Sequence, residues 1–185
     1  MVQSARQHTP PVRIAWLITG IPGAGKSTVA RLLAGSMPRS AHIEGDELGE
    51  LIIGGRVLPG QEPEEEAGRQ MDLNVQNQCL LARSFAEAGF VPVLDYVVVG
   101  RSRLERYRRA LDDFDLHFVV LHPGREVALH RDLTRPEKTV ARLWAYLEDE
   151  LVRELSGIGL WVDSGSLTAG ETMELILREQ DRARL

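Results

Sequence analysis

Apolar residues along this chain gather in short runs that alternate with longer amphipathic stretches. The short runs are typical of buried β-strands, and they cover residues 13–19, 40–44, 90–99, 115–122 and 159–164. The longer stretches repeat apolar residues every three or four positions and predict helices at 26–37, 46–53, 64–89, 101–111, 124–135, 137–157 and 168–184. Because helices separate the strands, the pattern predicts an α/β fold with a parallel sheet covered on both faces.

This pattern continues through residues 13–185 without a break, which predicts a single domain. Residues 1–12 show no periodicity, and we interpret them as a flexible N-terminal lead-in. Glycines and prolines in 54–63 predict a loop between two helices. Such a loop is consistent with a lid over a site and equally with a flexible connector.

Residues 20–28 read GIPGAGKST and match the phosphate-binding pattern G-x-x-x-x-G-K-[ST] in full. A buried run precedes the motif and an amphipathic helix follows it, as a P-loop requires. Its glycines allow successive backbone N–H groups to point at phosphate oxygens, and the helix start adds its positive dipole end. We therefore expect ATP to bind at Gly20, Pro22, Gly23, Ala24, Gly25, Lys26, Ser27 and Thr28.

Two side chains of this motif and one distant acid have specific roles in this interpretation. Lys26 reaches the β- and γ-phosphates, and the Ser27 hydroxyl holds Mg²⁺. Asp95 ends the apolar run 90–95, where it would orient magnesium-bound water as the acid of a Walker B strand does. A strand-end hydrogen-bond acceptor is the alternative role for Asp95.

A second group of acids follows the predicted strand 40–44, in the stretch HIEGDEL. Ligands of open parallel sheets bind outside the carboxyl ends of the strands, where the P-loop also lies. Asp46 is therefore placed to accept a proton from an attacking hydroxyl or to hold the acceptor in line. The alternative is that Asp46 caps a helix, while Glu47 favours the helix start and Glu44 is structural or lines the rim of the substrate site.

The segments LITGIPGAGKSTVARLLA, IEGDEL, VLDY and VDSGSLTAGET together resemble the small P-loop kinases. That group includes chloramphenicol phosphotransferase, gluconate and shikimate kinases, polynucleotide kinase domains and zeta toxins. The resemblance covers most of the chain from residue 13 onward. It implies a three-layer P-loop NTPase sandwich with a five-stranded parallel sheet in the order 2-3-1-4-5 and a helical lid.

The same resemblance implies functional roles for particular residues. Asp46 matches the general base that activates the acceptor hydroxyl, and Arg131 and Arg135 match lid arginines that neutralise charge on the phosphates. A solvated helix end is the alternative for both arginines. The resemblance also places adenine beside the loop 163–169, with Ser164 in contact, although Thr168 and Glu171 predict a helix capping box there.

The acceptor is expected between the segments that follow the second and third strands. Besides Asp46, the candidates for substrate binding are Arg56 in the loop 54–63 and Tyr96 and Arg101 in the segment 95–103, where Arg103 also lies. Most arginines of the helix 101–111 are expected to face water, because its leucines and tyrosine form one apolar stripe.

The formal net charge is −5, which argues against a general nucleic-acid-binding surface. The single cysteine, Cys79, excludes an intramolecular disulfide and shares an apolar helical row with core residues. The five histidines show no metal-ligand spacing. No leader and no apolar run long enough to cross a bilayer is evident, so we expect a cytoplasmic protein without a membrane partner, as a monomer or homodimer.

Taken together, these features predict an ATP- and Mg²⁺-dependent kinase that phosphorylates a hydroxyl of a small molecule, such as an antibiotic, a sugar acid or a nucleoside. A polynucleotide or nucleotide-sugar kinase is the first alternative and would need a basic groove at the acceptor side. A regulatory P-loop ATPase without an acceptor is the second. The sequence VLDY lacks the acid that often follows a Walker B aspartate in hydrolytic proteins.

Overall fold

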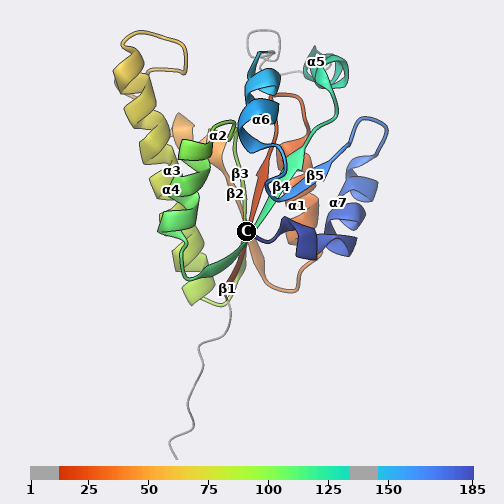
Figure 1. The fold of residues 1–185 in the computed structure, drawn as a ribbon. Helices are drawn as coiled ribbons and strands as arrows, with labels where there is room; N and C mark the ends of the chain where they lie inside the picture. The colour runs from red at the N-terminus through yellow and green to blue at the C-terminus, as the bar shows by residue number, and fades with distance from the viewer. Residues whose placement is uncertain (1–12, 134–145) are drawn as a thin grey trace, which may run out of the picture.

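The computed structural model describes residues 13–133 and 146–185, and these contain one parallel sheet of five strands. Figure 1 shows the sheet at the centre of the molecule, with strand order β2-β3-β1-β4-β5. The strands are β1 (Arg13–Thr19), β2 (Ser40–Glu44), β3 (Val91–Asp95), β4 (Phe114–Leu121) and β5 (Leu160–Val162). All four pairings are parallel, so the order implied by the family resemblance is confirmed.

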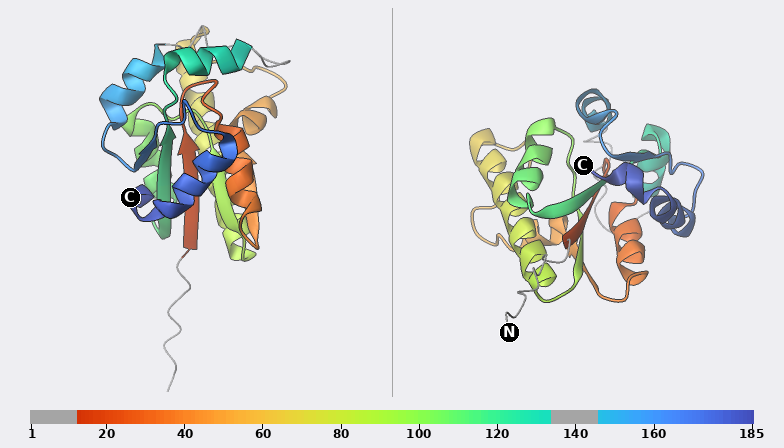
Figure 2. Two further views of the ribbon diagram at one scale, coloured as in Figure 1. Left: turned by 90° about the vertical axis from the view of Figure 1, so that its right-hand side faces the viewer. Right: turned by 60° about the horizontal axis from the view of Figure 1, so that its bottom comes forward.

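Helices cover both faces of this sheet and its carboxyl edge. On one face α1 (Lys26–Gly35) packs beside α7 (Ala169–Arg178), and on the other α3 (Glu64–Glu87) packs beside α4 (Arg101–Ala110). The two layers stand apart clearly in Figure 2. The remaining helices are α2 (Gly45–Glu50), α5 (Arg125–Leu133) and α6 (Leu147–Leu155), which lie at the edge where the strands end (Figure 1).

The predicted strand 90–99 is shorter in the structure, where β3 ends at Asp95. Beyond that point the chain leaves the sheet, because the side chain of Thr19 takes the place of the backbone hydrogen bonds between β1 and β3. Its hydroxyl accepts a hydrogen bond from Val98 N at 2.8 Å and donates one to Val98 O at 3.1 Å. This detour begins at Tyr96, so it determines where the acceptor-side candidates of this segment lie.

Several helix predictions also change at their ends, and the predicted helix 46–53 stops at Glu50. The predicted helix 168–184 ends at Arg178, and a short 3₁₀ helix, η1 (Gln180–Ala183), follows it. Of the predicted helix 137–157, the described part is α6. The predicted lead-in 1–12 and the lid residue Arg135 lie outside the described residues. Within the described ranges, no helix has both the length and the apolar character that crossing a membrane requires.

The core lies between the sheet and its two helical layers, and the strands supply its centre. Leu17, Ile18 and Phe118 are fully buried, as the continuous apolar runs predicted. Cys79 is also buried in this core, which confirms the structural interpretation of its helical row. Burial raises the pKa of the Cys79 thiol to about 12, so the thiol stays protonated and unreactive at neutral pH.

Candidate active site

The phosphate-binding motif forms a tight loop between β1 and α1. Gly25 is the N-cap of α1 in a left-handed conformation, with φ 91° and ψ 18°, and no side chain caps the helix start. A Cβ at Gly25 would meet nothing within 4 Å, so the space in front of the loop is open. An uncapped helix start that faces open space offers backbone N–H donors to an anion.

The back of this loop is packed against α5. A Cβ at Gly23, where φ is 83°, would lie 2.1 Å from the carbonyl oxygen of Ala128. Only glycine satisfies both the backbone conformation and the close approach. The loop is thus held in shape from behind while its front stays open.

Lys26 begins α1, and its side chain is only 8% exposed. Its ammonium group donates a hydrogen bond to Ile21 O at 3.4 Å, within the same loop. The cation therefore lies among the backbone donors of the loop, where the motif predicts that it meets phosphate oxygens.

Ser27 and Asp95 come together across the junction of α1 and β3. The Ser27 hydroxyl donates to Asp95 Oδ1 at 3.0 Å, and Asp95 is 2% exposed. A hydroxyl and a carboxylate oxygen are ligand types that Mg²⁺ prefers, so these two residues fit the predicted metal. The second carboxylate oxygen, Oδ2, lies 2.5 Å from Nε2 of His42, which fixes the orientation of Asp95.

His42 was not among the predicted site residues. It lies on β2 with Glu44, and ligand atoms of His42, Glu44 and Asp95 all lie within 4.8 Å of one another. The signal that was available in the sequence is the two-residue spacing of His42 and Glu44, which places both on one face of a strand. The sheet register then pairs Glu44 with Asp95.

A cavity of about 390 Å³ lies beside the loop, between α1, α5 and the start of α7. Its lining residues come from the P-loop, α1, α5, the loop after β5 and the start of α7, and are Gly23, Ala24, Gly25, Thr28, Val29, Arg131, Ser164, Leu167, Thr168, Ala169 and Thr172. Ser164 is 2% exposed, and its hydroxyl has no hydrogen-bond partner within the described residues. A buried polar group without a partner at a cavity wall points to a ligand that would supply one.

The predicted capping box of α7 is confirmed at the same wall. Thr168 Oγ1 accepts a hydrogen bond from Glu171 N at 3.2 Å, and the Glu171 carboxylate accepts one from Thr168 N at 2.8 Å. The hydrogen bonds that Thr168 donates to the Glu171 carboxylate from its backbone N and its hydroxyl lower the pKa of Glu171. The loop before α7 therefore has a fixed end, and the cavity has a rigid wall.

Arg131 on α5 spans the cavity to this loop. Its Nη2 donates to Ser164 O at 2.9 Å, with longer contacts to Gly165 O at 3.4 Å and Leu167 O at 3.5 Å. In this arrangement the guanidinium binds the 164–167 backbone and forms part of the cavity wall. A guanidinium in such a wall can stack on a planar base. The predicted roles of Arg131 in nucleotide binding and in charge neutralisation both stay predictions.

Asp46 lies in the first turn of α2, directly after β2. The N-cap of α2 is Glu44, and no side chain makes a cap hydrogen bond. The carboxylate of Asp46 is exposed and has no hydrogen bond or ion pair to any described residue. The alternative that Asp46 caps this helix is therefore wrong, and its carboxylate stays available for a ligand.

Tyr96 packs directly against the backbone that carries Asp46. A Cβ at Gly45 would lie 2.5 Å from Cδ2 of the Tyr96 ring and 2.6 Å from Gln78 Nε2. Burial raises the pKa of Tyr96, the charge of Asp46 raises it further, and the charges of Arg103 and Arg56 act in the opposite direction. Asp46, Tyr96, Arg56 and Arg103 thus share one electrostatic neighbourhood, whereas Arg101 is exposed at the start of α4 without such a contact.

A chain of buried side chains holds the start of α2 from below. Tyr107 Oη donates to Gln78 Oε1 at 2.9 Å, Gln78 Nε2 donates to Asn74 Oδ1 at 2.8 Å, and Asn74 Nδ2 donates to Gly45 O at 2.7 Å. Burial raises the pKa of Tyr107 well above its ordinary value, so the phenol stays a donor. Through these bonds α4 and α3 fix the peptide immediately before Asp46.

A protein-family model described as an AAA domain, AAA_18, matches residues 17–153. The chain belongs to this family. The AAA_18 match includes the P-loop, Asp46, Asp95 and Arg131, and so covers both sides of the site described above. A curated relative is a UPF0200 protein of Aeropyrum pernix, which is 29% identical over 153 residues, 82% of this chain and 79% of that protein.

Several solved structures with the same fold are named as kinases of small molecules. A sugar kinase from Janibacter sp. HTCC2649 has a TM-score of 0.68 at 19% identity, covering 94% of this chain and 96% of its own. A gluconokinase from Sinorhizobium meliloti 1021 gives 0.68 at 19% identity over 94% of both chains. The APS kinase CysC of Mycobacterium tuberculosis, in complex with AMPPNP and APS, gives 0.65 at 19% identity over 91% and 98%. The AAA_18 chain described here therefore has the fold of the small P-loop kinases, as the sequence resemblance implied.

Proposed function

We propose that this protein is an ATP-dependent phosphotransferase that moves the γ-phosphoryl group to a hydroxyl of a small molecule. The observation that carries the proposal is the carboxylate of Asp46, which is exposed and without a partner among the described residues, at the same sheet edge as the P-loop. A nucleotide switch does not require a free acid at that position. A kinase does, because it must orient an alcohol toward the γ-phosphorus.

The residues of the nucleotide side would bind and orient ATP. Backbone N–H groups of the P-loop and Lys26 would hold the phosphates, while the cavity beside Arg131 and Ser164 would take the base. When Mg²⁺ is bound at Ser27 and Asp95, it supplies charge neutralisation on the phosphates. One structural neighbour, the APS kinase CysC, was solved in complex with AMPPNP, which supports ATP as the donor.

On the acceptor side, Asp46 would accept the proton of the acceptor hydroxyl. The hydroxyl oxygen forms the new bond to the γ-phosphorus, and the bond from that phosphorus to the oxygen bridging it to the β-phosphate breaks. ADP then leaves with the electron pair of the broken bond. The protein positions the groups for this in-line exchange, and Lys26 with the lid arginines Arg131 and Arg135 would neutralise the moving charge.

A metabolite screen tests this function directly. The purified protein is incubated with ATP, Mg²⁺ and a low-molecular-weight metabolite pool, and mass spectrometry searches for compounds that gain one phosphate. We expect one compound or one related set to be phosphorylated, and to stimulate ATP consumption strongly. The Lys26→Ala variant serves as the control for contaminating kinases. Rapid ATP hydrolysis without any phosphorylated compound would instead support the regulatory ATPase alternative.

A further inference from the structure

Most arginines of the described ranges already have an acidic partner. Ion pairs within 4.0 Å involve Arg13, Arg31, Arg69, Arg83, Arg106, Arg108, Arg125, Arg153, Arg182 and Arg184. In contrast, neither Arg56 nor Arg103 forms an ion pair or a side-chain hydrogen bond with any described residue. Arg39, Arg101, Arg109 and Arg178 also lack an ion pair within the described ranges, but of these unpaired arginines only Arg56 and Arg103 act on the pKa of Tyr96.

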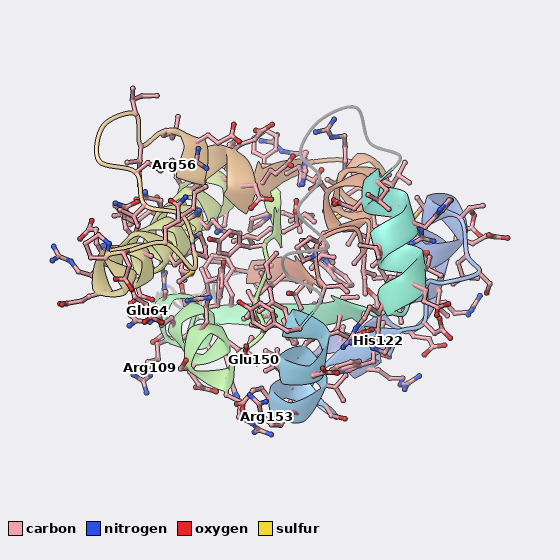
Figure 3. All side chains as sticks on the ribbon, turned by 90° about the horizontal axis from the view of Figure 1, so that it is seen from above. Arg56, Glu64, Arg109, His122, Glu150 and Arg153 are labelled. Atoms are coloured by element: carbon pink, nitrogen blue, oxygen red, sulfur yellow. The ribbon has the colours of Figure 1, made fainter. Side chains whose placement is uncertain are left out.

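Arg56 is held in place although it lies on an exposed loop. The side chain of Gln70 on α3 accepts a hydrogen bond from Val57 N at 2.9 Å and donates one to Gly55 O at 2.7 Å. These two bonds flank Arg56 and attach its backbone to α3. Figure 3 shows Arg56 beside α2, the helix whose first turn contains Asp46. The loop 54–63 is therefore not a free connector at this residue.

Arg103 lies in the first turn of α4, one turn before Tyr107, whose hydroxyl donates to Gln78 on α3. Helix α3 also holds the backbone around Arg56 through Gln70, two turns before Gln78. The Nε of Arg103 is buried and lacks a hydrogen-bond partner within the described residues, and the charges of Arg103 and Arg56 both counter the rise in the pKa of Tyr96. A buried guanidinium donor without an acceptor costs free energy unless a ligand supplies the acceptor.

We propose that the acceptor is an anionic alcohol, a small molecule that carries a carboxylate or phosphate group besides the hydroxyl that is phosphorylated, and that Arg56 and Arg103 bind this anion. The inference rests on the proposed transfer reaction and names its substrate class. An anion that met both guanidinium groups would offset the charge of each and would accept a hydrogen bond from the buried Nε of Arg103.

The position of Asp46 gives this arrangement a second effect. A carboxylate or phosphate on the acceptor is repelled by Asp46 and by the triphosphate of ATP, and it is attracted to the two arginines. The charged end of the acceptor would therefore turn away from the P-loop, and the hydroxyl end would face Asp46. Because the charged group and the reactive hydroxyl of the acceptor bind at opposite ends of the site, the orientation of the acceptor determines which hydroxyl is phosphorylated.

The substrate class is tested by dividing the metabolite pool on an anion-exchange column before the kinase assay. We expect phosphorylation of compounds in the retained, anionic fraction. Phosphorylation confined to the flow-through would overturn the inference and leave the proposed function intact. If the protein binds ATP and phosphorylates nothing in either fraction, the proposed transfer reaction fails, and the inference fails with it.

The two arginines are tested with the retained acceptor in hand. We expect Arg56→Gln and Arg103→Gln each to raise the KM for the acceptor by about 10- to 100-fold, with the KM for ATP within about twofold. A thermal unfolding curve shows whether Arg103→Gln remains folded. Arg103→Lys keeps the charge and serves as the conservative variant. Since Arg56 is exposed, its variant tests the inference even where the Arg103 variant is unstable.

Arg109→Gln is the matched control, because Arg109 lies on the same helix as Arg103, is exposed, and sits far from Arg56 (Figure 3). It removes one positive charge from the protein without touching the acceptor side, so its kinetic constants should not change. An unchanged acceptor KM in both Arg56→Gln and folded Arg103→Gln would overturn the assignment, as would an equal rise in Arg109→Gln.

Discussion

The nucleotide side and the acceptor side of this molecule are built in different ways. On the nucleotide side, backbone groups supply most of the site, from the open start of α1 to the carbonyls that Arg131 contacts. On the acceptor side, the candidate groups are side chains of α2, of the loop after it and of the segment after β3. One side depends on chain geometry, and the other depends on which residues the chain carries.

This difference explains how each side responds to change. A backbone site tolerates substitution of its side chains, but its shape is lost when a glycine gains a Cβ. A side-chain site keeps its shape under many substitutions, and a single replacement changes what it binds. The same fold can therefore carry different acceptor sites, which is consistent with neighbours that are named as a gluconokinase and an APS kinase.

The largest expected effect is on the acceptor side, at Asp46. Asp46→Asn removes the base while keeping the shape of the side chain, so transfer to the identified acceptor should fall by about 10²- to 10⁴-fold. Binding of a non-hydrolysable ATP analogue, measured by calorimetry, should stay within about twofold. Glu47→Gln is the matched control, since Glu47 is the exposed acid next in the same turn. Full activity of Asp46→Asn would show that the acceptor side does not depend on this carboxylate, and the contrast with the nucleotide side would fail.

On the nucleotide side, Gly23→Ala should be the most disruptive single methyl group. The new Cβ would meet Ala128 O at 2.1 Å in a left-handed conformation, so we expect a loss of about 2–4 kcal/mol in the free energy of unfolding. Urea denaturation measures this loss. Gly35→Ala in α1, where a Cβ meets nothing within 4 Å, should be neutral or stabilising. Equal stability of the two variants would contradict a loop packed against α5.

The buried chain below α2 gives the next effect. Gln78→Leu leaves Tyr107 Oη and Asn74 Oδ1 without partners, which should cost about 2–3 kcal/mol in chemical denaturation. The acceptor KM should rise as well, because Asn74 holds the peptide before Asp46, whereas ATP affinity should not change. Gln76→Leu, at an exposed position two residues away on α3, should change stability by about 0.5 kcal/mol or less. If both variants lose the same stability, the chain has no role in holding α2.

The smallest effect is expected at Gln70, which touches no ligand in this proposal. Gln70→Ala releases Gly55 O and Val57 N, so Arg56 should lose its fixed position and the acceptor KM should rise by about 3- to 10-fold. The kcat and the KM for ATP should stay constant, which distinguishes a positioning role from general destabilisation. Gln61→Ala alters the same loop at Leu58 and provides the control. A fall in kcat without a change in the acceptor KM would be evidence against a positioning role for Gln70.

Sequence reasoning was effective where a site is local in the chain. The P-loop spans nine residues, the capping box joins Thr168 to Glu171, and both are present in the structure. Ser27 and Asp95 were predicted as ligands of the same metal because each follows a strand that ends at the same edge, and the structure brings the two side chains into contact. Spacing and periodicity carry such information because the partners are close in sequence or occupy equivalent strand ends.

Sequence reasoning was weaker where contacts depend on packing between elements that are distant in the chain. His42 meets Asp95 across 53 residues, and Tyr107 meets Gln78 across 29. Neither pair has a motif, and each requires the register of the sheet or the crossing of two helices to be known first. The premature end of β3 has the same origin, since a single threonine on β1 takes the place of the strand partner.

Arg131 holds the loop after β5 by its carbonyl oxygens, which every amino acid possesses. A descendant of this protein can therefore replace Leu167 and still offer the guanidinium the same acceptor, provided that the loop keeps its course. Gly165 lacks this freedom, because a Cβ there would lie 2.8 Å from Pro123 O. Evolution can reshape the rim of the cavity at Leu167 without first finding a compensating mutation in α5.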